Sequence, residues 1–175
     1  MIPVLETARL RLRPHGMADF EALASLWADP VVTRFIGGKP ATREESWARL
    51  LRYSGLWPLL GFGYWLVEDR ATGTYLGDVG FADFHRQIEP APPALPEIGW
   101  VLSPAAHGSG VATEAATAAL GWLGRDSFCI IDPAHGASLR VAAKLGFESR
   151  GLARYRDASV TVLLRRQPLP GVCNA

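Results

Sequence analysis

The stretch EIGWVLSPAAHGSGVATEAATAALGWL, residues 97–123, contains three elements in a row. Residues 97–102 resume a strand pattern after a proline-rich loop, and Pro104 ends it. Residues 111–124 have high helix propensity, and their nearly continuous alanine surface allows a helix to approach a sheet closely. The segment HGSG joins the two. The stretch therefore predicts a strand, a glycine turn and a helix.

The glycine turn has two interpretations. A helix N-terminus exposes unpaired backbone N–H groups and the positive end of the helix dipole, and glycines let a phosphate approach without a Cβ in the way. Gly108 and Gly110, in front of Val111, fit such a phosphate cradle. The motif is not a Walker loop, because no Gly-Lys-Ser/Thr follows, and it is not a dinucleotide fingerprint, because Thr113 stands at the third glycine position. A purely structural turn is the alternative.

The N-terminal third of the chain predicts one strand and two helices. Residues 8–13 alternate apolar and basic side chains, which is the period of a strand with one covered face. Apolar residues at helical spacing then predict a helix that ends at Pro30. Thr42 and Glu45 form a capping-box pattern at the start of the second helix. That helix is expected to turn three residues inward: Trp47, Leu50 and Leu51.

The remaining segments complete the order of elements. Residues 62–81 place aromatic and β-branched residues on both sides of a turn at Gly73, which predicts an antiparallel hairpin, with Trp65 in the core. Four prolines in QIEPAPPALP predict a loop. A strand at 128–131, a helix that ends at Gly146 and a strand over SVTVLLRR follow. The order β-α-α-β-β-β-α-β-α-β predicts an α+β fold with helices packed on a sheet.

Length and composition restrict the class of protein. The 175 residues, 49% of them hydrophobic, are enough for one well-buried domain, expected over 1–168 with a short tail at 169–175. Eighteen Lys and Arg against 17 Asp and Glu give a net charge of +1, and the scattered arginines predict no nucleic-acid partner. Cys129 and Cys173 lack metal-site or disulfide spacing. We expect a soluble, cytoplasmic protein without a metal or a membrane segment.

Four segments together resemble the GNAT superfamily of N-acetyltransferases. The opening stretch closely resembles its acetyl-CoA-binding core, and DPAHGASLRVAAKLGFESRG, residues 132–151, resembles the strand, loop and helix that follow. ETARLRLRP and GTYLGDVGF resemble the branch of ribosomal-protein N-terminal acetyltransferases. The resemblance implies the GNAT acyl-CoA N-acyltransferase fold: a central mixed, mostly antiparallel sheet with a splayed parallel strand pair, flanked by helices.

The resemblance also implies where acetyl-CoA binds. In this family the pantetheine lies in the gap between the splayed strands and bonds to the backbone of the first, here residues 97–102. Backbone N–H groups of residues 107–112 are expected to hold the pyrophosphate. The cofactor-binding residues implied in this way are Val101, Leu102, His107, Gly108, Ser109, Gly110, Val111, Ala112, Thr113, His135 and Ser138.

Three positions depart from the family pattern. His107 stands where the family usually has Arg, Gln or Trp, and His135 stands where it usually has an Asn that bonds the cofactor or ties the strands together. Many relatives use a Tyr as proton donor at the position of Ala142. These departures motivate a second hypothesis beside the N-acetyltransferase, namely a non-catalytic acyl-CoA-binding regulatory module.

The reaction that the resemblance implies is a direct attack of a neutral amine on a thioester. A Lys amine titrates near ~10.4, so an enzyme at neutral pH benefits from a base. Glu97 is the first candidate, and a solvent-exposed strand-edge carboxylate is its alternative. Ser138 is the candidate proton donor to the leaving thiolate, and a helix N-cap is its alternative. Four further residues are weaker candidates for proton transfer: Asp78, Asp83 and His85 as bases and Tyr155 as a donor.

The acceptor is expected to be a primary amine. Residues 31–37, VTRFIGG, occupy the place of the acceptor loop in relatives, so Arg34 and Phe35 are candidate substrate-binding residues. Protein N-termini, amino sugars, polyamines, amino acids and antibiotics all stay open, and so does a homodimer. Acetyl-CoA binding and CoA release with a panel of amines separate the two functional hypotheses.

Overall fold

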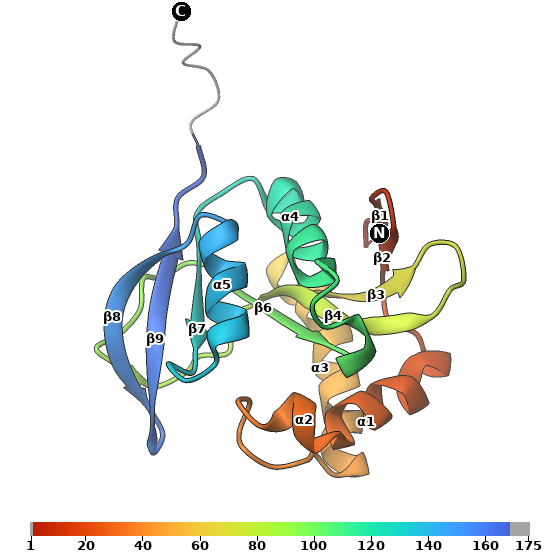
Figure 1. Cartoon of the computed structure of the whole chain (residues 1–175), viewed down its shortest axis with the longest axis horizontal. Helices are drawn as coiled ribbons and strands as arrows, with labels where there is room; N and C mark the ends of the chain where they lie inside the picture. The colour runs from red at the N-terminus through yellow and green to blue at the C-terminus, as the bar shows by residue number, and fades with distance from the viewer. Residues whose placement is uncertain (1, 169–175) are drawn as a thin grey trace, which may run out of the picture.

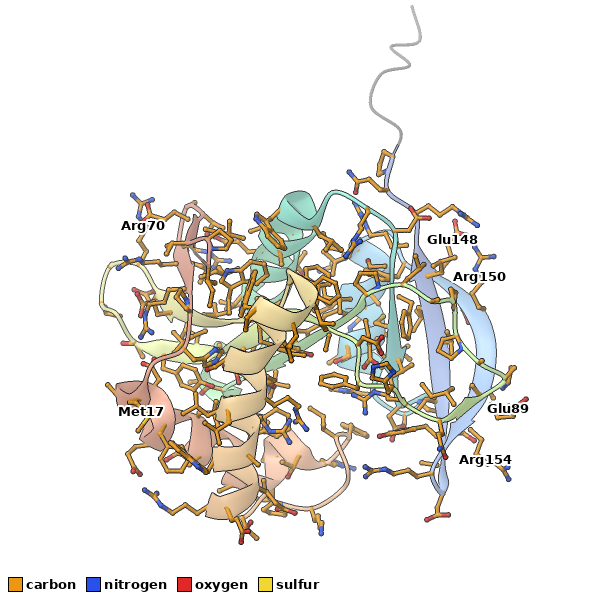
Figure 2. All side chains as sticks on the ribbon, turned by 180° about the vertical axis from the view of Figure 1, so that it is seen from behind. Met17, Arg70, Glu89, Glu148, Arg150 and Arg154 are labelled. Carbon is orange, nitrogen blue, oxygen red and sulfur yellow. The ribbon has the colours of Figure 1, made fainter. Side chains whose placement is uncertain are left out.

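The computed structural model describes residues 2–168. A mixed sheet of nine strands runs through the chain, in the order β1-β2-β3-β4-β6-β7-β9-β8-β5. The helices α4 and α5 cover one face of the sheet, and α1 and α3 cover the other (Figures 1 and 2). No helix within residues 2–168 combines the length and the apolar character needed to cross a bilayer. The strands are β1 (Leu5–Glu6), β2 (Leu10–Arg13), β3 (Tyr64–Asp69), β4 (Tyr75–Ala82), β5 (Ile88–Glu89), β6 (Glu97–Leu102), β7 (Ser127–Ile131), β8 (Glu148–Tyr155) and β9 (Ala158–Arg165), and the α-helices are α1 (Phe20–Ala28), α2 (Pro30–Thr33), α3 (Arg43–Leu60), α4 (Val111–Leu123) and α5 (Gly136–Lys144).

The pairing of β6 with β7 is the feature that positions the site. These two strands are parallel, and a single residue pair, Glu97 with Phe128, joins them in register. Beyond it β6 continues on β4 and β7 continues on β9, both antiparallel. The two strands therefore diverge toward their C-terminal ends. The predicted mixed, mostly antiparallel sheet with a splayed parallel pair is confirmed.

Local signals predicted several elements correctly. Residues 64–82 form the antiparallel hairpin of β3 and β4, and Trp65 is fully buried. At the start of α3, the Thr42 hydroxyl accepts from the Glu45 N–H at 3.1 Å, and the Glu45 carboxylate accepts from the Thr42 N–H at 2.7 Å. The predicted end of α5 at Gly146 is also confirmed, since this glycine adopts a left-handed φ of 81° after the last helical turn.

Of the predictions about the first helices, the end of the first is confirmed and one inward residue of the second is wrong. The helix α1 ends at Ala28, before Pro30, and Pro30 then begins the unpredicted helix α2, where Asp29 caps the helix by accepting from the Val31 N–H at 2.8 Å. A proline lacks the N–H that the first helical position leaves unpaired, so it fits there. Leu51 does not face the core and is 53% exposed, because the buried stripe of α3 runs through Leu50 and Tyr53.

Three strands were not predicted: β1, β5 and β8. The longest of them, β8, pairs with β9 on one side and β5 on the other. Its side chains are mostly exposed, and Glu148, Arg150 and Arg154 point away from the molecule in Figure 2. Only Ala153 of this strand is buried. Backbone pairing with β9 therefore makes this segment a strand, without the alternation of apolar and polar residues that identifies a strand from sequence.

A close approach of two strands gives a testable expectation for stability. A Cβ on Gly80 in β4 would lie 2.3 Å from the Tyr64 Cα and 2.4 Å from the Gly63 carbonyl oxygen, both backbone atoms of or beside β3. Gly80→Ala is therefore expected to lower the free energy of unfolding by about 2 kcal/mol or more, measured by chemical denaturation. Gly121→Ala is the matched control: no atom lies within 4 Å of its added Cβ, and a helical alanine is expected to raise stability by about 0.5–1 kcal/mol.

Candidate active site

The loop between β6 and α4 presents a row of backbone N–H groups. Gly108 and Gly110 have left-handed φ values of 73° and 82°, which other residues rarely adopt, and Gly110 is the N-cap of α4. Within residues 2–168, no protein group accepts from the backbone N–H groups of residues 108–113, and the first bond of the helix is Glu114 N–H to the Gly110 carbonyl, at 3.0 Å. Six consecutive donors at a helix N-terminus form a site for an anion.

The position of this row differs by one residue from the expected one. The N–H of His107 donates to the Pro104 carbonyl at 3.1 Å, so it is not free to bind a phosphate. The imidazole of His107 also has an internal partner, since its Nε2 lies 3.0 Å from the carbonyl oxygen of Leu102, the last residue of β6. With the proton on Nε2, His107 donates to this carbonyl and ties the loop to the strand.

The turn between β1 and β2 stabilises the glycine loop, and these contacts were not predicted. Arg9 Nη1 donates to the Ser109 carbonyl at 3.0 Å, and Arg9 Nε donates to the Glu114 carboxylate at 2.7 Å. The Thr7 hydroxyl donates to the same carboxylate at 2.6 Å. Glu114 lies in the first turn of α4, so these bonds fasten the glycine loop and the helix to the β1–β2 turn.

The side chains of the core hold β6 in place. Val101, Leu102 and Val111 are all at least nine-tenths buried. Their side chains pack in the two core clusters on either face of the sheet, so a ligand could reach only backbone groups, and those of Val101 face β4. Because β6 has no ladder partner on the β7 side after Glu97, its backbone has an open edge where the strands diverge.

Predicted cofactor and acceptor residues meet at the N-terminus of α5. Phe35, from the segment between α2 and α3, stacks on His135 with ring centroids 4.5 Å apart and an interplanar angle of 16°. The Arg34 guanidinium lies 5.1 Å from the Phe35 ring centroid. The Ser138 hydroxyl lies 3.4 Å from His135 Nε2. Burial lowers the pKa of His135, and nearby His107 lowers it further against the opposing effect of Asp132, so His135 is neutral at pH 7.

Glu97 is a buried, ion-paired carboxylate at the point where β6 and β7 diverge. It is 6% exposed, so the alternative of a solvent-exposed strand-edge carboxylate is wrong. Arg86 Nε lies 3.1 Å and 2.9 Å from its two oxygens, and Arg86 Nη1 donates to the Tyr155 hydroxyl at 2.9 Å. Burial raises the pKa of Glu97 above its usual value, although Arg86 opposes the shift.

Of the four weaker candidates for proton transfer, Tyr155 lies beside Arg86, and the other three lie in other surroundings. Asp78 is fully buried and accepts from His15 Nε2 at 2.8 Å and from the Tyr75 hydroxyl at 3.0 Å, so its carboxylate faces internal partners. Asp83 and His85 have exposed side chains in the loop after β4, where Asp83 accepts from the His85 N–H at 2.9 Å. Ala142 is fully buried in α5.

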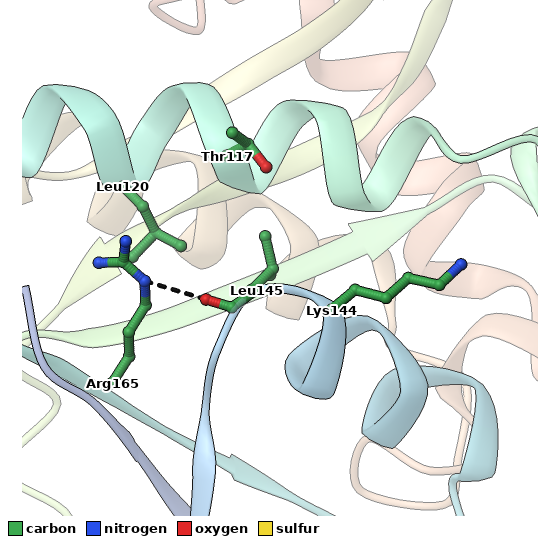
Figure 3. A pocket seen from close by; sticks show the side chains of 5 residues that line it. All are labelled: Thr117, Leu120, Lys144, Leu145 and Arg165. Carbon is green, nitrogen blue, oxygen red and sulfur yellow. Dashed lines mark hydrogen bonds between the residues drawn. The ribbon is translucent and has the colours of Figure 1, made fainter. Parts of the chain in front are cut away.

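A separate pocket of about 230 Å³ lies between the helices on the α4 side of the sheet. Arg165 lines it and donates from Nε to the Leu145 carbonyl at 3.0 Å (Figure 3). None of its lining residues belongs to the predicted site, and the glycine loop is not part of it. The lining residues are Thr117, Leu120, Lys144, Leu145 and Arg165.

Comparison with known families agrees with this geometry. Residues 9–148 match the family model described as "Acetyltransferase (GNAT) domain". The chain belongs to this acetyltransferase family. The matched range includes both splayed strands, the glycine loop and α5, the elements on which the candidate site lies.

Individual relatives of this GNAT acetyltransferase extend over nearly its whole length. It is 31% identical to YkkB of Bacillus subtilis over 93% of this chain and 95% of the relative. A crystal structure of an acetyltransferase from Agrobacterium tumefaciens superposes with a TM-score of 0.81 at 29% identity, covering 95% of this chain and 96% of that one. A putative GnaT-family acetyltransferase from Bordetella pertussis gives the same TM-score at 27% identity, covering 94% and 99%.

Proposed function

We propose that this protein transfers an acetyl group from acetyl-CoA to a primary amine by direct attack of the amine nitrogen on the thioester. The observation that supports this most is the row of six unbonded N–H groups of residues 108–113 beside the diverging strands. A pyrophosphate needs donors and positive potential, and the N-terminus of α4 supplies both. Within residues 2–168, the space beside Gly108 is open, since a Cβ added there would have no atom within 4 Å.

The other proposed contacts to the cofactor follow from the divergence of β6 and β7. The open edge of β6 at Leu102 would pair with the amide groups of the pantetheine, as a strand would pair with its neighbour, whereas the backbone groups of Val101 face β4. His135 and Ser138, at the start of α5, lie on the far side of the gap. The segments ETARLRLRP and GTYLGDVGF, which contain β2 and β4, support a place in the ribosomal-type branch of the family.

The reaction forms one C–N bond and breaks one C–S bond. The amine must lose a proton, and Glu97 accepts it, directly or through a water, because burial raises its pKa toward the range in which a carboxylate is an effective base. The leaving thiolate takes up a proton from Ser138. A free thiol titrates near ~8.5, so this donor has only a modest task.

The test combines a binding measurement with a product measurement. Acetyl-CoA is titrated into the protein by calorimetry, and CoA release is followed with a library of primary amines whose products are identified by mass spectrometry. Binding with N-acetylated products supports the proposal. Binding without turnover of any amine would instead support a non-catalytic acyl-CoA-binding module, which His135 and Ala142 motivate. A failure to bind acetyl-CoA would contradict both.

A further inference from the structure

Two arginines of α3 point at aromatic rings under the sheet. Arg49 and Arg52 are three residues apart, so they lie on one side of the helix. The Arg49 guanidinium carbon lies 3.4 Å from the ring centroid of Trp27, and that of Arg52 lies 5.3 Å from the ring centroid of Phe84. Both rings pack in the core cluster between α1, α3 and the sheet. The two charges are therefore directed at the face of the sheet that α1 and α3 cover.

Neither arginine has an acidic partner. Within residues 2–168, no carboxylate lies within ion-pair distance of Arg49 or Arg52. The Nε of Arg49 is buried and has no hydrogen-bond partner. A buried donor without a partner costs free energy, and a charged one costs more. Other arginines of the chain do meet carboxylates: Arg9, Arg11, Arg13, Arg43 and Arg86.

One of the two charges, that of Arg52, lies near the ion pair of Arg86 and Glu97. The Arg86 guanidinium carbon lies 4.5 Å from the ring centroid of Phe84, so this one ring has guanidinium groups from both Arg52 and Arg86 around it. Arg86 is bound to Glu97. Burial lowers the pKa of Arg52, and the positive charges of Arg49 and Arg86 lower it further, although an arginine stays charged at neutral pH. Within residues 2–168, Glu97 itself pairs only with Arg86, and Arg52 lies next to that pair on the shared Phe84 ring.

We infer that the acceptor is a small amine that also has a carboxylate, which Arg52 and Arg49 bind while its amino group lies at Glu97. This inference rests on the proposed function. A guanidinium donates two parallel N–H bonds to a carboxylate, and the pairing supplies the anion that the unpaired arginines lack. A polyamine would bring only further positive charge to this face and would be repelled. The substrate class is therefore the amino acids and related amino carboxylates.

The first test compares acceptors that differ only in the carboxylate. Each proteinogenic L-amino acid is assayed beside its α-amide and its decarboxylated amine, with acetyl-CoA as donor. For the preferred side chain, the acid is expected to exceed the amide and the amine in kcat/KM by about 10- to 100-fold, because charge-assisted bonds are lost in both analogues. Amides or decarboxylated amines that match or exceed the acids would overturn the inference.

The second test removes the arginines. Arg52 is partly exposed, so Arg52→Gln is expected to fold, and it should lower kcat/KM for the acid by about 10- to 100-fold while leaving that for the amide and the Kd for acetyl-CoA unchanged. Arg49→Gln should act in the same direction. Arg43→Gln is the control, because it removes the same charge from an exposed position of the same helix. Equal losses for acid and amide in Arg52→Gln would contradict the assignment.

Binding without reaction separates this inference from the proposed function. Each amino acid and its amide is added to the protein with CoA, and the shift in Tm is measured. A larger shift with acids than with amides, abolished in Arg52→Gln and kept in Arg43→Gln, supports the carboxylate site even if no amine is acetylated. Equal shifts for acids and amides would overturn it even if some amine is acetylated.

Discussion

Gly110→Asp is expected to weaken acetyl-CoA binding by at least about 100-fold. The new carboxylate would stand at the N-cap of α4, beside the unbonded N–H groups, where a pyrophosphate brings further negative charge. Two like charges about 4 Å apart repel by about 4 kcal/mol at an effective dielectric constant near 20. A loss of only about 3 kcal/mol of binding free energy already raises Kd by a factor of more than 100. Calorimetric titration of acetyl-CoA measures the effect.

The comparison variants separate charge from backbone strain. Aspartate and asparagine tolerate a left-handed φ better than other side chains, and the nearest atom to a Cβ on Gly110 is Arg9 Nη2 at 3.5 Å, so both have room. Gly110→Asn is therefore expected to bind more tightly than Gly110→Asp. Gly124→Asp puts the same residue into the same left-handed conformation at the other end of α4 and should leave the Kd unchanged. Unchanged binding by Gly110→Asp would exclude the loop as the phosphate site.

Glu97→Gln is expected to lower kcat by about 100-fold or more, with little change in the Kd for acetyl-CoA. A glutamine keeps the shape of the side chain but cannot accept the proton of the attacking amine, and positioned bases contribute about 10²–10⁴ in rate. Because burial raises the pKa of Glu97, activity of the unmodified enzyme should fall as the pH is lowered through a value above the usual 4.5 of a glutamate. A pH profile of kcat measures this acidic limb.

Arg86→Gln distinguishes a base from a structural ion pair. Arg86 lowers the pKa of Glu97, so its removal should let that pKa rise and move the acidic limb of kcat to higher pH. Both variants break the same ion pair, so a merely structural role predicts equal losses of activity. If Glu97 is the base, Glu97→Gln loses far more at high pH than Arg86→Gln does. Equal losses, or an acidic limb that does not move, would remove Glu97 from the proposed mechanism.

Part of the fold was predictable because its causes are local. The capping box of Thr42 and Glu45, the hairpin of β3 and β4 and the left-handed glycine after α5 each depend on residues close in the chain. β8 was not predictable in this way. Its exposed charged residues give no apolar alternation, and only pairing with β9 and β5 makes it a strand.

In the candidate site too, the features with local causes were predicted and those that depend on remote residues were not. The glycine loop was predicted from its residues, since left-handed glycines before a helix expose N–H groups whatever surrounds them. Its contacts with the β1–β2 turn were not predicted, because Arg9 and Glu114 are 105 residues apart. The state of Glu97 was also missed: the sequence left open a solvent-exposed carboxylate, and the structure buries it against Arg86.

The sequence by itself determined the order of the elements other than β1, α2, β5 and β8, the glycine loop at the N-terminus of α4 and the family, because these depend on near neighbours and on a motif that covers most of the chain. Only the tertiary structure decided which charges meet. It paired Arg86 with Glu97, stacked Phe35 on His135 and, among residues 2–168, left Arg49 and Arg52 without a carboxylate at ion-pair distance. Charge pairing depends on distances of a few ångströms between segments remote in sequence, and composition does not determine those distances.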